Sequence, residues 1–466
     1  MPFIVCKFAI KIYSDEIIVS FVNIVIETPE LFNSKWIFVP LRLMPNKIQF
    51  TTSPHFAREM DDGDVLNKYR SYFHIPKIKG KAAVYLCGNS LGLQPKKAKE
   101  YINQELSDWA QYGVEGHFEA KMPWFSYHHF FTKSLAKIVG AKATEVVAMN
   151  TLTVNLQLLM LTFYKPTAKR FKIIMEAGAF PSDMYAVETL VKHFGLKPKD
   201  AIVEIAPRKG EYIIRHEDLL AAITANKSSL AMLMMGGVNY YTGQLFDMKA
   251  ITTAAQKVGA KVGFDLAHAV GNVPLELNKW NVDFACWCSY KYLNSGPGAV
   301  GGVFIHEKHA TNKKLNRLAG WWGHNEKTRF KMEKGFDPMP NAQAWQMSNA
   351  PVMNMVSHRA SLDIFDEVSM KMLREKSELL TGYALFLLGE IKHLQFEIIT
   401  PTPFEQRGCQ ISMLFKNRGK EVFTQLQKNG VIADWREPNV IRIAPVPLYN
   451  SFQDILDLFD ILSNMK

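Results

Sequence analysis

The 466-residue sequence contains little cysteine, and its five cysteines form an odd, thinly spread set: Cys6, Cys87, Cys286, Cys288 and Cys409. Such a set excludes a disulfide framework and favours a reducing compartment, so we predict a cytoplasmic protein. Cys286 and Cys288 form C-x-C rather than the C-x-x-C of zinc sites. We interpret them as two small core side chains on one face of a strand, and the sequence predicts no metal site.

Long apolar runs are also missing. The run at residues 17–26, IIVSFVNIVI, has about half the length that a membrane span needs. Asp15 and Glu16 stand just before it, where a secretory signal would carry positive charge. We therefore predict no membrane contact. Residues 1–45 are predicted to be a weakly specified extension, and Met44 is a candidate alternative start.

Basic residues exceed acidic ones, 55 against 44, but no basic block with interleaved aromatic residues occurs. Nucleic-acid binding is therefore not predicted. The excess of 11 positive charges suits an anionic ligand, such as a phosphate-bearing cofactor or an acidic substrate. A hydrophobic fraction of 48% and a charged fraction of 21% are typical of a globular protein with a sizeable core.

Short apolar runs alternate with helical stretches over much of the chain. FKIIMEA precedes PSDMYAVETLVKHFG, for example, and LAMLMMGG precedes FDMKAITTAAQKVG. Pro95 is expected to open a helix that ends near Tyr112. The alternation predicts a mostly parallel sheet covered by helices on both faces. The predicted organisation comprises an N-terminal arm with helices that joins the small domain (46–84), a large domain (85–350) and a smaller α/β domain (351–466).

Gly296, Gly298 and Gly301 match the G-x-G-x-x-G pattern of dinucleotide-binding proteins. That pattern binds pyrophosphate only where a helix opens directly behind the glycines. Here GVFIHE follows, which is typical of a strand. An NAD dehydrogenase is therefore the weaker interpretation, and the glycines more plausibly form a loop that passes close to a bulky group.

Lys291 and Asp265 each follow an apolar strand-like run. Because the carboxyl ends of parallel strands meet at one edge of a sheet, both side chains can reach one pocket. A pyridoxal phosphate enzyme needs such a pair: an amine for the aldehyde of the cofactor and a carboxylate for its ring nitrogen. The alternative is a surface lysine and a helix-capping aspartate.

Further residues favour the cofactor interpretation. NTLTVNLQ places backbone amides and hydroxyls before a helix, which suits a phosphate; the alternative is a simple cap by Thr151 or Thr153. Phe180 could stack on a flat ring, with Asp183 three residues later; the alternatives are a core phenylalanine and a first-turn residue of a helix. His268 follows Asp265 by three residues, or is simply a half-buried histidine.

Seven stretches together resemble the kynureninase family of pyridoxal phosphate enzymes, which has the aspartate-aminotransferase-like fold (fold type I). They are LCGNSLGLQPK, NTLTVNLQLLMLTFYKPT, EAGAFPSDMYA, YYTGQLFD, FDLAHAVGNVPLELNKWNVDFACWCSYKYLNSGPGAVGG, GWWGH together with TRFKM, and NVIRIAPVPLYNSF. The resemblance covers about residues 72–463. It implies an α/β protein with a large mostly parallel-sheet domain and a smaller α/β domain, working as a homodimer with shared active sites.

The resemblance also implies an activity: hydrolysis of L-kynurenine or its 3-hydroxy form to an anthranilate and L-alanine, in tryptophan catabolism and NAD biosynthesis. Lys291, as the Schiff-base lysine, Tyr290 and Asp265 would be the catalytic residues. The cofactor would contact Leu152, Thr153, Phe180, Pro181, Ser182, Asp183, Asp265, His268, Tyr290 and Lys291, with Trp321 and Asn349 from the neighbouring subunit. The substrate would contact Ser90, His117, Asn349 and Arg442, with Arg442 on its carboxylate and Arg436 as the alternative.

Two positions depart from the family pattern. Gly236 stands where vertebrate-like members have serine, and Trp322 stands where many have phenylalanine. Two rival functions stay open. A cysteine desulfurase would need a reactive thiol, but the Cys409 segment is typical of the start of a strand. A cofactor-binding protein without catalysis is the other rival, and Gly236 is the position that keeps it open.

Overall fold

The computed structural model describes residues 11–13, 16–18 and 48–465. The chain divides into two units, residues 1–50 and 51–466. In the first unit, β1 (Lys11–Tyr13) and β2 (Glu16–Ile18) pair as antiparallel strands. The rest of the predicted extension, including most of the apolar run at residues 17–26, lies outside the described residues.

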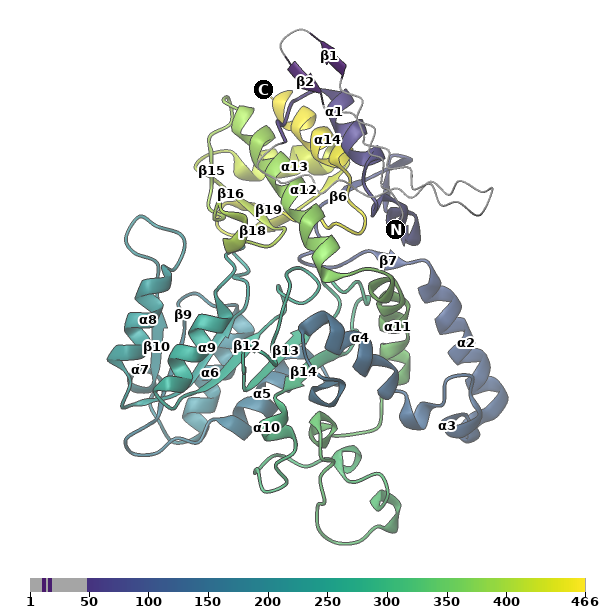
Figure 1. Ribbon diagram of the computed structural model, residues 1–466, viewed down its shortest axis with the longest axis vertical. Helices are drawn as coiled ribbons and strands as arrows, with labels where there is room; N and C mark the ends of the chain where they lie inside the picture. Colours follow the sequence, from purple (N-terminus) through teal and green to yellow (C-terminus); the bar gives the residue numbers. More distant parts are fainter. Residues whose placement is uncertain (1–10, 14–15, 19–47, 466) are drawn as a thin grey trace, which may run out of the picture. The chain divides into compact units, whose positions relative to one another are not determined.

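A seven-stranded sheet forms the centre of the second unit (Figure 1). Its first five strands are parallel, and the last two pairings, β13 with β14 and β14 with β8, are antiparallel. The predicted mostly parallel sheet is therefore confirmed. In spatial order the strands are β10 (Ile202–Ile205), β9 (Lys172–Glu176), β11 (Leu230–Gly236), β12 (Lys261–Asp265), β13 (Phe284–Cys288), β14 (Gly301–Ile305) and β8 (Val146–Ala148).

Two apolar layers cover the faces of this sheet because alternate strand residues point to opposite sides. On β13, Phe284 and Cys286 belong to one layer, and Ala285 and Trp287 belong to the other. The helices that complete the Phe284 layer are α5 (Leu152–Phe163), α6 (Pro181–His193), α7 (Pro198–Ala201) and α10 (Glu307–Ala310). Those that complete the Trp287 layer are α4 (His129–Val139), α8 (His216–Ala225), α9 (Met248–Lys257) and α11 (Val352–Glu367).

The glycine-rich segment leads into a strand and not into a helix, as the sequence predicts. Gly301 is the first residue of β14, and Gly296 and Gly298 have positive φ angles of 84° and 74° in the preceding loop. Pro95, in contrast, does not open a helix. It lies in β7 (Gln94–Pro95), which pairs with β3 (Phe73–His74), and α2 (Lys97–Tyr112) begins two residues later.

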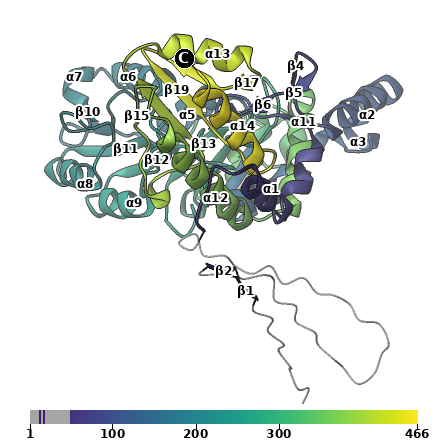
Figure 2. The same cartoon turned by 90° about the horizontal axis from the view of Figure 1, so that it is seen from above.

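A four-stranded antiparallel sheet lies in the C-terminal part of the chain (Figure 1). Its strands, in order, are β15 (Phe396–Ile398), β16 (Ile411–Phe415), β19 (Val440–Ile443) and β18 (Asp434–Arg436). The helices of this region are α12 (Met370–Glu390), α13 (Gly419–Lys428) and α14 (Phe452–Ser463), and α12 and α14 lie side by side (Figure 2).

The segment that precedes the large sheet also contacts this C-terminal part. Helix α1 (Pro54–Asp62) packs on α14, and Arg70 Nη1 lies 2.6 Å from Asp454 Oδ2. Strand β6 (Val84–Tyr85) pairs with β17 (Val431–Ile432). Three further short elements are β4 (Lys77–Ile78), β5 (Lys81–Ala82) and α3 (Gly116–Glu119). The predicted domain limits stay a prediction.

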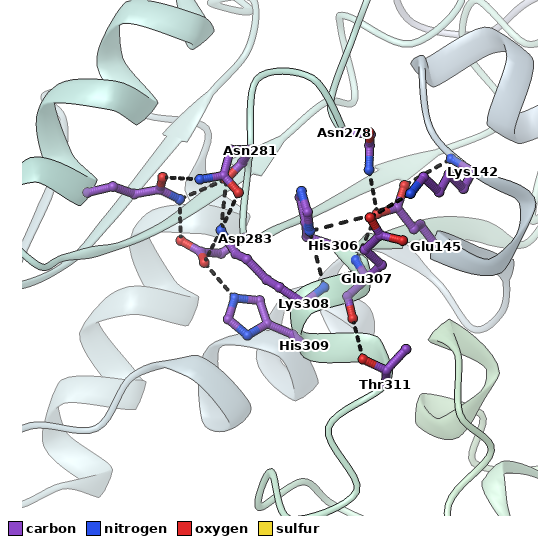
Figure 3. A network of polar contacts seen from close by, with 11 residues as sticks. Lys142, Glu145, Asn278, Asn281, Asp283, His306, Glu307, Lys308, His309 and Thr311 are labelled. Atoms are coloured by element: carbon purple, nitrogen blue, oxygen red, sulfur yellow. Dashed lines mark hydrogen bonds and ion pairs between the residues drawn. The ribbon is translucent and has the colours of Figure 1, made fainter.

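Two buried carboxylates organise the amino edge of the large sheet (Figure 3). Asp283 precedes β13 and accepts hydrogen bonds from the Val262 amide at 2.9 Å and His309 Nε2 at 2.6 Å. Burial opposes its ionisation, but these bonds and neighbouring lysines outweigh that effect, so the pKa of Asp283 is lowered. Glu145, which precedes β8, accepts a hydrogen bond from the Glu307 amide at 2.7 Å. Both carboxylates are thus structural.

Within residues 48–465, none of the helices combines the length and the apolar character that crossing a membrane needs. The four cysteines in this range are free, and Cys286, Cys288 and Cys409 are buried.

Candidate active site

The opposite, carboxyl edge of the large sheet carries the candidate site. Glu176, Gly236 and Asp265 are the last residues of the neighbouring strands β9, β11 and β12, and Lys291 follows the end of β13 by three residues. They border a cavity of about 300 Å³. Its wall consists of Asn89, Ser90, Leu152, Glu176, Phe180, Asp183, Gly236, Val238, Tyr240, Asp265, Ala267, His268, Tyr290, Lys291 and Arg436.

The Lys291 amine sits between two rings. Its Nζ lies 2.9 Å from His268 Nε2 and 5.9 Å from the centre of the Phe180 ring. Burial, and then the charge of Lys291, holds the pKa of His268 well below its usual value, so this imidazole is neutral. Phe180 is 39% exposed, which contradicts the alternative of a core phenylalanine. Its ring is free to cover a ligand in the cavity.

Three buried carboxyl groups, those of Asp265, Asp183 and Glu176, line the same cavity as this amine. Asp265 accepts a hydrogen bond from the Ala267 amide at 2.7 Å, and Glu176 accepts one from the Gly236 amide at 3.2 Å. Burial raises the pKa of Asp265, although the Ala267 amide, Lys291 and a hydrogen bond from Asp183 oppose the rise. Burial and the nearby Asp265 charge hold the pKa of Asp183 well above its usual value. Asp183 is therefore the protonated partner, which donates to the Asp265 carboxylate.

Glu176 is the third member of this group. Burial raises its pKa to about 7, and the Asp265 charge adds to the rise, while the Gly236 amide opposes it. Carboxylates that are buried with too little positive charge are unfavourable unless a cation joins them. The group therefore fits a ligand that presents a cationic nitrogen to Asp265.

The other end of the cavity is formed by the start of α5. Thr151 is the residue before the first turn, but its side chain makes no capping hydrogen bond within residues 48–465, so the capping alternative is not supported. Leu152, the first helical residue, lines the cavity, and Thr153 follows it with an exposed side chain. The free amides of a helix start favour a phosphate group.

These features fit pyridoxal phosphate. Its cationic ring nitrogen suits the carboxyl group at Asp265, its aldehyde suits the Lys291 amine, and its flat ring suits the exposed face of Phe180. The start of α5 would take the phosphate.

The structure brings eight of the predicted site residues to the cavity wall: Ser90, Leu152, Phe180, Asp183, Asp265, His268, Tyr290 and Lys291. Thr153, Pro181 and Ser182 are sequence neighbours of wall residues. His117, Trp321, Asn349 and Arg442 do not line it.

These four residues lie in different surroundings. His117 is half-buried on α3, with Nδ1 2.9 Å from the Val114 carbonyl oxygen. Trp321 is 49% exposed and donates from Nε1 to the Arg329 carbonyl at 3.3 Å. Asn349 lines a second cavity of about 250 Å³. Thr151, at the start of α5, also lines this second cavity.

Arg442 is fully buried on β19, where it donates to the Asp434 carboxylate and to the Tyr240 carbonyl. Arg436, the alternative, lines the cavity itself and lies 3.2 Å from Asp434 Oδ2. Asp434 thus contacts both arginines, and Tyr240, whose carbonyl accepts from Arg442, is itself a wall residue of the cavity.

Sequence reasoning missed Glu176, Asn89, Val238, Tyr240 and Ala267 as wall residues. A pattern that could have indicated Glu176 is present: an acidic residue ends a buried apolar run, as Asp265 does. The other four are uncharged residues of loops. Asn89, Tyr240 and Ala267 lie within stretches that carry the resemblance, but their residue types indicate no chemistry, and Val238 lies outside those stretches.

Comparison with protein families gives two matches. Residues 373–462 match the model described as "Kynureninase C-terminal domain", and residues 123–276 match that of the DegT/DnrJ/EryC1/StrS aminotransferase family. The kynureninase of Flavobacterium psychrophilum is 54% identical over 416 residues, which are 89% of this chain and 98% of that protein. The human kynureninase is 46% identical over 434 residues, 89% of this chain and 93% of that protein.

Solved structures with a similar fold are more distant in sequence. A C-DES mutant with glycine covalently linked to its PLP cofactor matches with a TM-score of 0.70 and 14% identity, over 82% of this chain and 97% of that chain. A cysteine desulfurase from Thermococcus onnurineus matches with a TM-score of 0.66 and 15% identity, over 90% and 98%. At this identity the likeness shows the fold alone.

The raised pKa of Glu176 predicts a pH-dependent stability. The pKa of this carboxyl group rises from 4.5 in the unfolded chain to about 7 in the folded protein. Its contribution to the free energy of unfolding is therefore fully present at a pH below 4.5 and is lost as the pH rises through 7. The glutamine of Glu176→Gln is neutral at every pH, so this position no longer makes the stability depend on pH. Without cofactor, the stability of the variant relative to the wild type should therefore increase by roughly 3 kcal/mol between about pH 4 and pH 8.

Urea-induced unfolding of both cofactor-free proteins at several pH values measures this difference. Glu204→Gln, at an exposed position of β10, is the control and should follow the wild type. Parallel pH profiles for Glu176→Gln and the wild type would show that Glu176 is ionised as easily as a surface carboxyl group.

Proposed function

The chain belongs to the kynureninase family, and we propose that the cavity between Lys291 and Asp265 is the place where its reaction occurs. The protein is a pyridoxal phosphate enzyme that hydrolyses a carbon–carbon bond in a ketonic substrate. It converts L-kynurenine, its 3-hydroxy form or both to the corresponding anthranilate and L-alanine, in tryptophan catabolism and NAD biosynthesis. The observation that carries this function is the 54% identity over nearly the whole of a kynureninase.

Each end of the cavity would hold one part of the cofactor. Lys291 would bind its aldehyde carbon, Asp265 its ring nitrogen and Phe180 one face of its ring, with His268 beside it. The phosphate would lie at Leu152, Thr153 and Tyr290, and the segment Pro181, Ser182 and Asp183 would complete the pocket. When bound, pyridoxal phosphate withdraws electrons from the substrate Cα.

The neutral acid Asp183 supports this arrangement. By donating a hydrogen bond to Asp265, it stabilises the ionised form of the carboxylate that must face the ring nitrogen. Glu176 occupies the space near Gly236: a Cβ atom at this glycine would lie 3.0 Å from Glu176 Oε1. In this chain, therefore, a glutamate carboxyl fills the position toward which a serine side chain would point.

Two side chains would move protons. The Lys291 amine, once free of the cofactor, lies where it can take the proton from the substrate Cα. Burial, and then the nearby Cys288 thiol, raises the pKa of Tyr290, so its hydroxyl stays protonated and can donate in the later steps. A water molecule must add to the ketone carbon before the carbon–carbon bond breaks, and the anthranilate leaves first.

Different residues would bind the two ends of the substrate, its α-carboxylate and its aryl ring. Arg442 would hold the α-carboxylate by two parallel hydrogen bonds, for which its Tyr240 contact would have to open. Ser90 and His117 would face the aryl ring, together with Asn349. Trp322, which packs against Phe125 at 5.3 Å between ring centres, would shape the aryl pocket.

We also propose a homodimer in the cytoplasm. Trp321 and Asn349 lie outside the wall of the cavity in their own chain, which supports their contribution to the site of a second copy. Cys87, Cys286, Cys288 and Cys409 are all free, which supports a reducing compartment.

Cys409, the thiol considered for the desulfurase alternative, is in a poor position to act as a nucleophile. Cys409 is 1% exposed, and burial raises the pKa of its thiol to about 12, which makes a reactive thiolate unfavourable.

Lys291→Ala should lower kcat for anthranilate formation from kynurenine by about 10⁴-fold or more, because no other amine at the site can replace it. Lys279→Ala, at a surface lysine that is 73% exposed, is the matched control and should keep wild-type kinetics. Steady-state assays with kynurenine, 3-hydroxykynurenine and cysteine measure both the function and the assignment. Turnover of cysteine alone would refute the function; turnover of kynurenine by Lys291→Ala would refute the assignment of the lysine.

The two arginines can be distinguished by charge-conserving variants. If Arg442 holds the carboxylate, Arg442→Lys should lower kcat/KM by about 10- to 100-fold through loss of the paired hydrogen bonds. Arg436→Lys should change it by less than about 3-fold. The reverse order would assign the carboxylate to Arg436. Cofactor affinity should be unchanged in both variants.

A shared site can be tested by mixing subunits. Lys291→Ala and Trp321→Ala should each be inactive or impaired, but a hybrid dimer contains one site with both native residues. Random mixing should restore about a quarter of wild-type activity, since about half of the dimers are hybrids with one intact site. Activity no higher than the sum of the separate variants, or a monomer in solution, would contradict the shared site.

A further inference from the structure

Three potential metal ligands meet away from the cavity. His128 and His129 stand at the start of α4, and Glu326 lies in the loop between Trp321–Gly323 and Arg329–Lys331. One ligand atom from each of them lies within 4.8 Å of the others. His129 Nε2 and Glu326 Oε1 are 3.1 Å apart. Because 197 residues separate these two in sequence, no local pattern reveals the cluster.

His128 is the unusual member of the cluster. It has no exposed surface, and neither of its ring nitrogens makes a hydrogen bond within residues 48–465. A buried imidazole without hydrogen-bond partners is unfavourable, and a bound ion is one explanation for such a group. Either ring nitrogen of an imidazole can offer a lone pair to a metal ion.

Gln343 supplies the remaining contact that a metal-binding histidine needs. Its side chain lies next to the His128 imidazole. Its Oε1 is itself buried and has no other partner in the described part of the chain. Metal-binding histidines usually donate their second ring N–H to such an oxygen, which fixes the ring orientation.

We propose that His128, His129 and Glu326 bind a zinc ion. Two neutral imidazoles and one carboxylate form a ligand set that suits Zn²⁺, with water at the fourth position. The site has an entry path, because the His129 and Glu326 side chains are 41% and 32% exposed while His128 forms the buried base. Zn²⁺ would replace the direct contact between His129 Nε2 and Glu326 Oε1.

The ion would have a structural role. It would hold the start of α4 against the segment from Trp321 to Lys331. In this segment, the Arg329 guanidinium donates to the Trp322 carbonyl and stacks 4.3 Å from the Trp322 ring. Because this segment also includes Trp321, bound zinc would fix the backbone that carries Trp321 and Trp322. No step of the hydrolysis requires the ion.

Zinc titration of the untagged, cofactor-loaded enzyme tests the proposal. After treatment with a chelator, the wild type should bind one Zn²⁺ per chain in competition with a chromophoric chelator, and its Tm should rise. His129→Ala and Glu326→Gln should weaken binding by at least about 100-fold, beyond the 10- to 100-fold typical of outer-shell changes. Gln343→Ala should fall within that smaller range.

His55→Ala is the matched control. It removes another histidine–glutamate pair at 3.1 Å, His55 with Glu59, which is not part of any three-ligand cluster in residues 48–465. It should keep wild-type zinc affinity. Circular dichroism of each variant without zinc checks its fold. The proposal is overturned if the wild type binds no zinc at micromolar concentrations, or if folded His129→Ala and Glu326→Gln bind it as tightly as the wild type.

Discussion

The balance of buried charge at the carboxyl edge of the sheet is the constraint on which the site depends. Asp265, Asp183 and Glu176 are all buried, and Lys291 is the cation that acts on Asp265. Full ionisation of the three carboxyl groups would be very unfavourable, so protons stay on part of the group. A cofactor that brings a cationic ring nitrogen relieves this constraint, which links cofactor binding directly to the protonation of the protein.

Buried carboxyl groups at the two edges of the large sheet have different environments and different roles. At the amino edge, Asp283 is matched by His309 and nearby lysines, and its pKa is low (Figure 3). At the carboxyl edge, Asp183 and Glu176 have little matching positive charge, and their pKa values are raised. Matched carboxylates stabilise a fold, whereas unmatched ones in a cavity are typical of functional sites.

Much of this arrangement could be predicted from the sequence, because strand ends are local features. The apolar runs before Asp265 and Lys291 place both residues at one edge, and the strand after Gly301 excludes a dinucleotide site. Contacts between distant segments could not be predicted in this way. The burial of Arg442 against Asp434 depends on how two strands pair, and the cluster of His128 with Glu326 depends on a loop far away in sequence.

The central claim is that one amine, Lys291, carries the cofactor opposite the Asp265 carboxylate. Reduction of the purified, cofactor-loaded enzyme with borohydride would make the linkage between cofactor and protein permanent, and peptide mapping would locate it. The account predicts a single modified peptide that contains Lys291. A label on another lysine, or no covalent label at all, would contradict it.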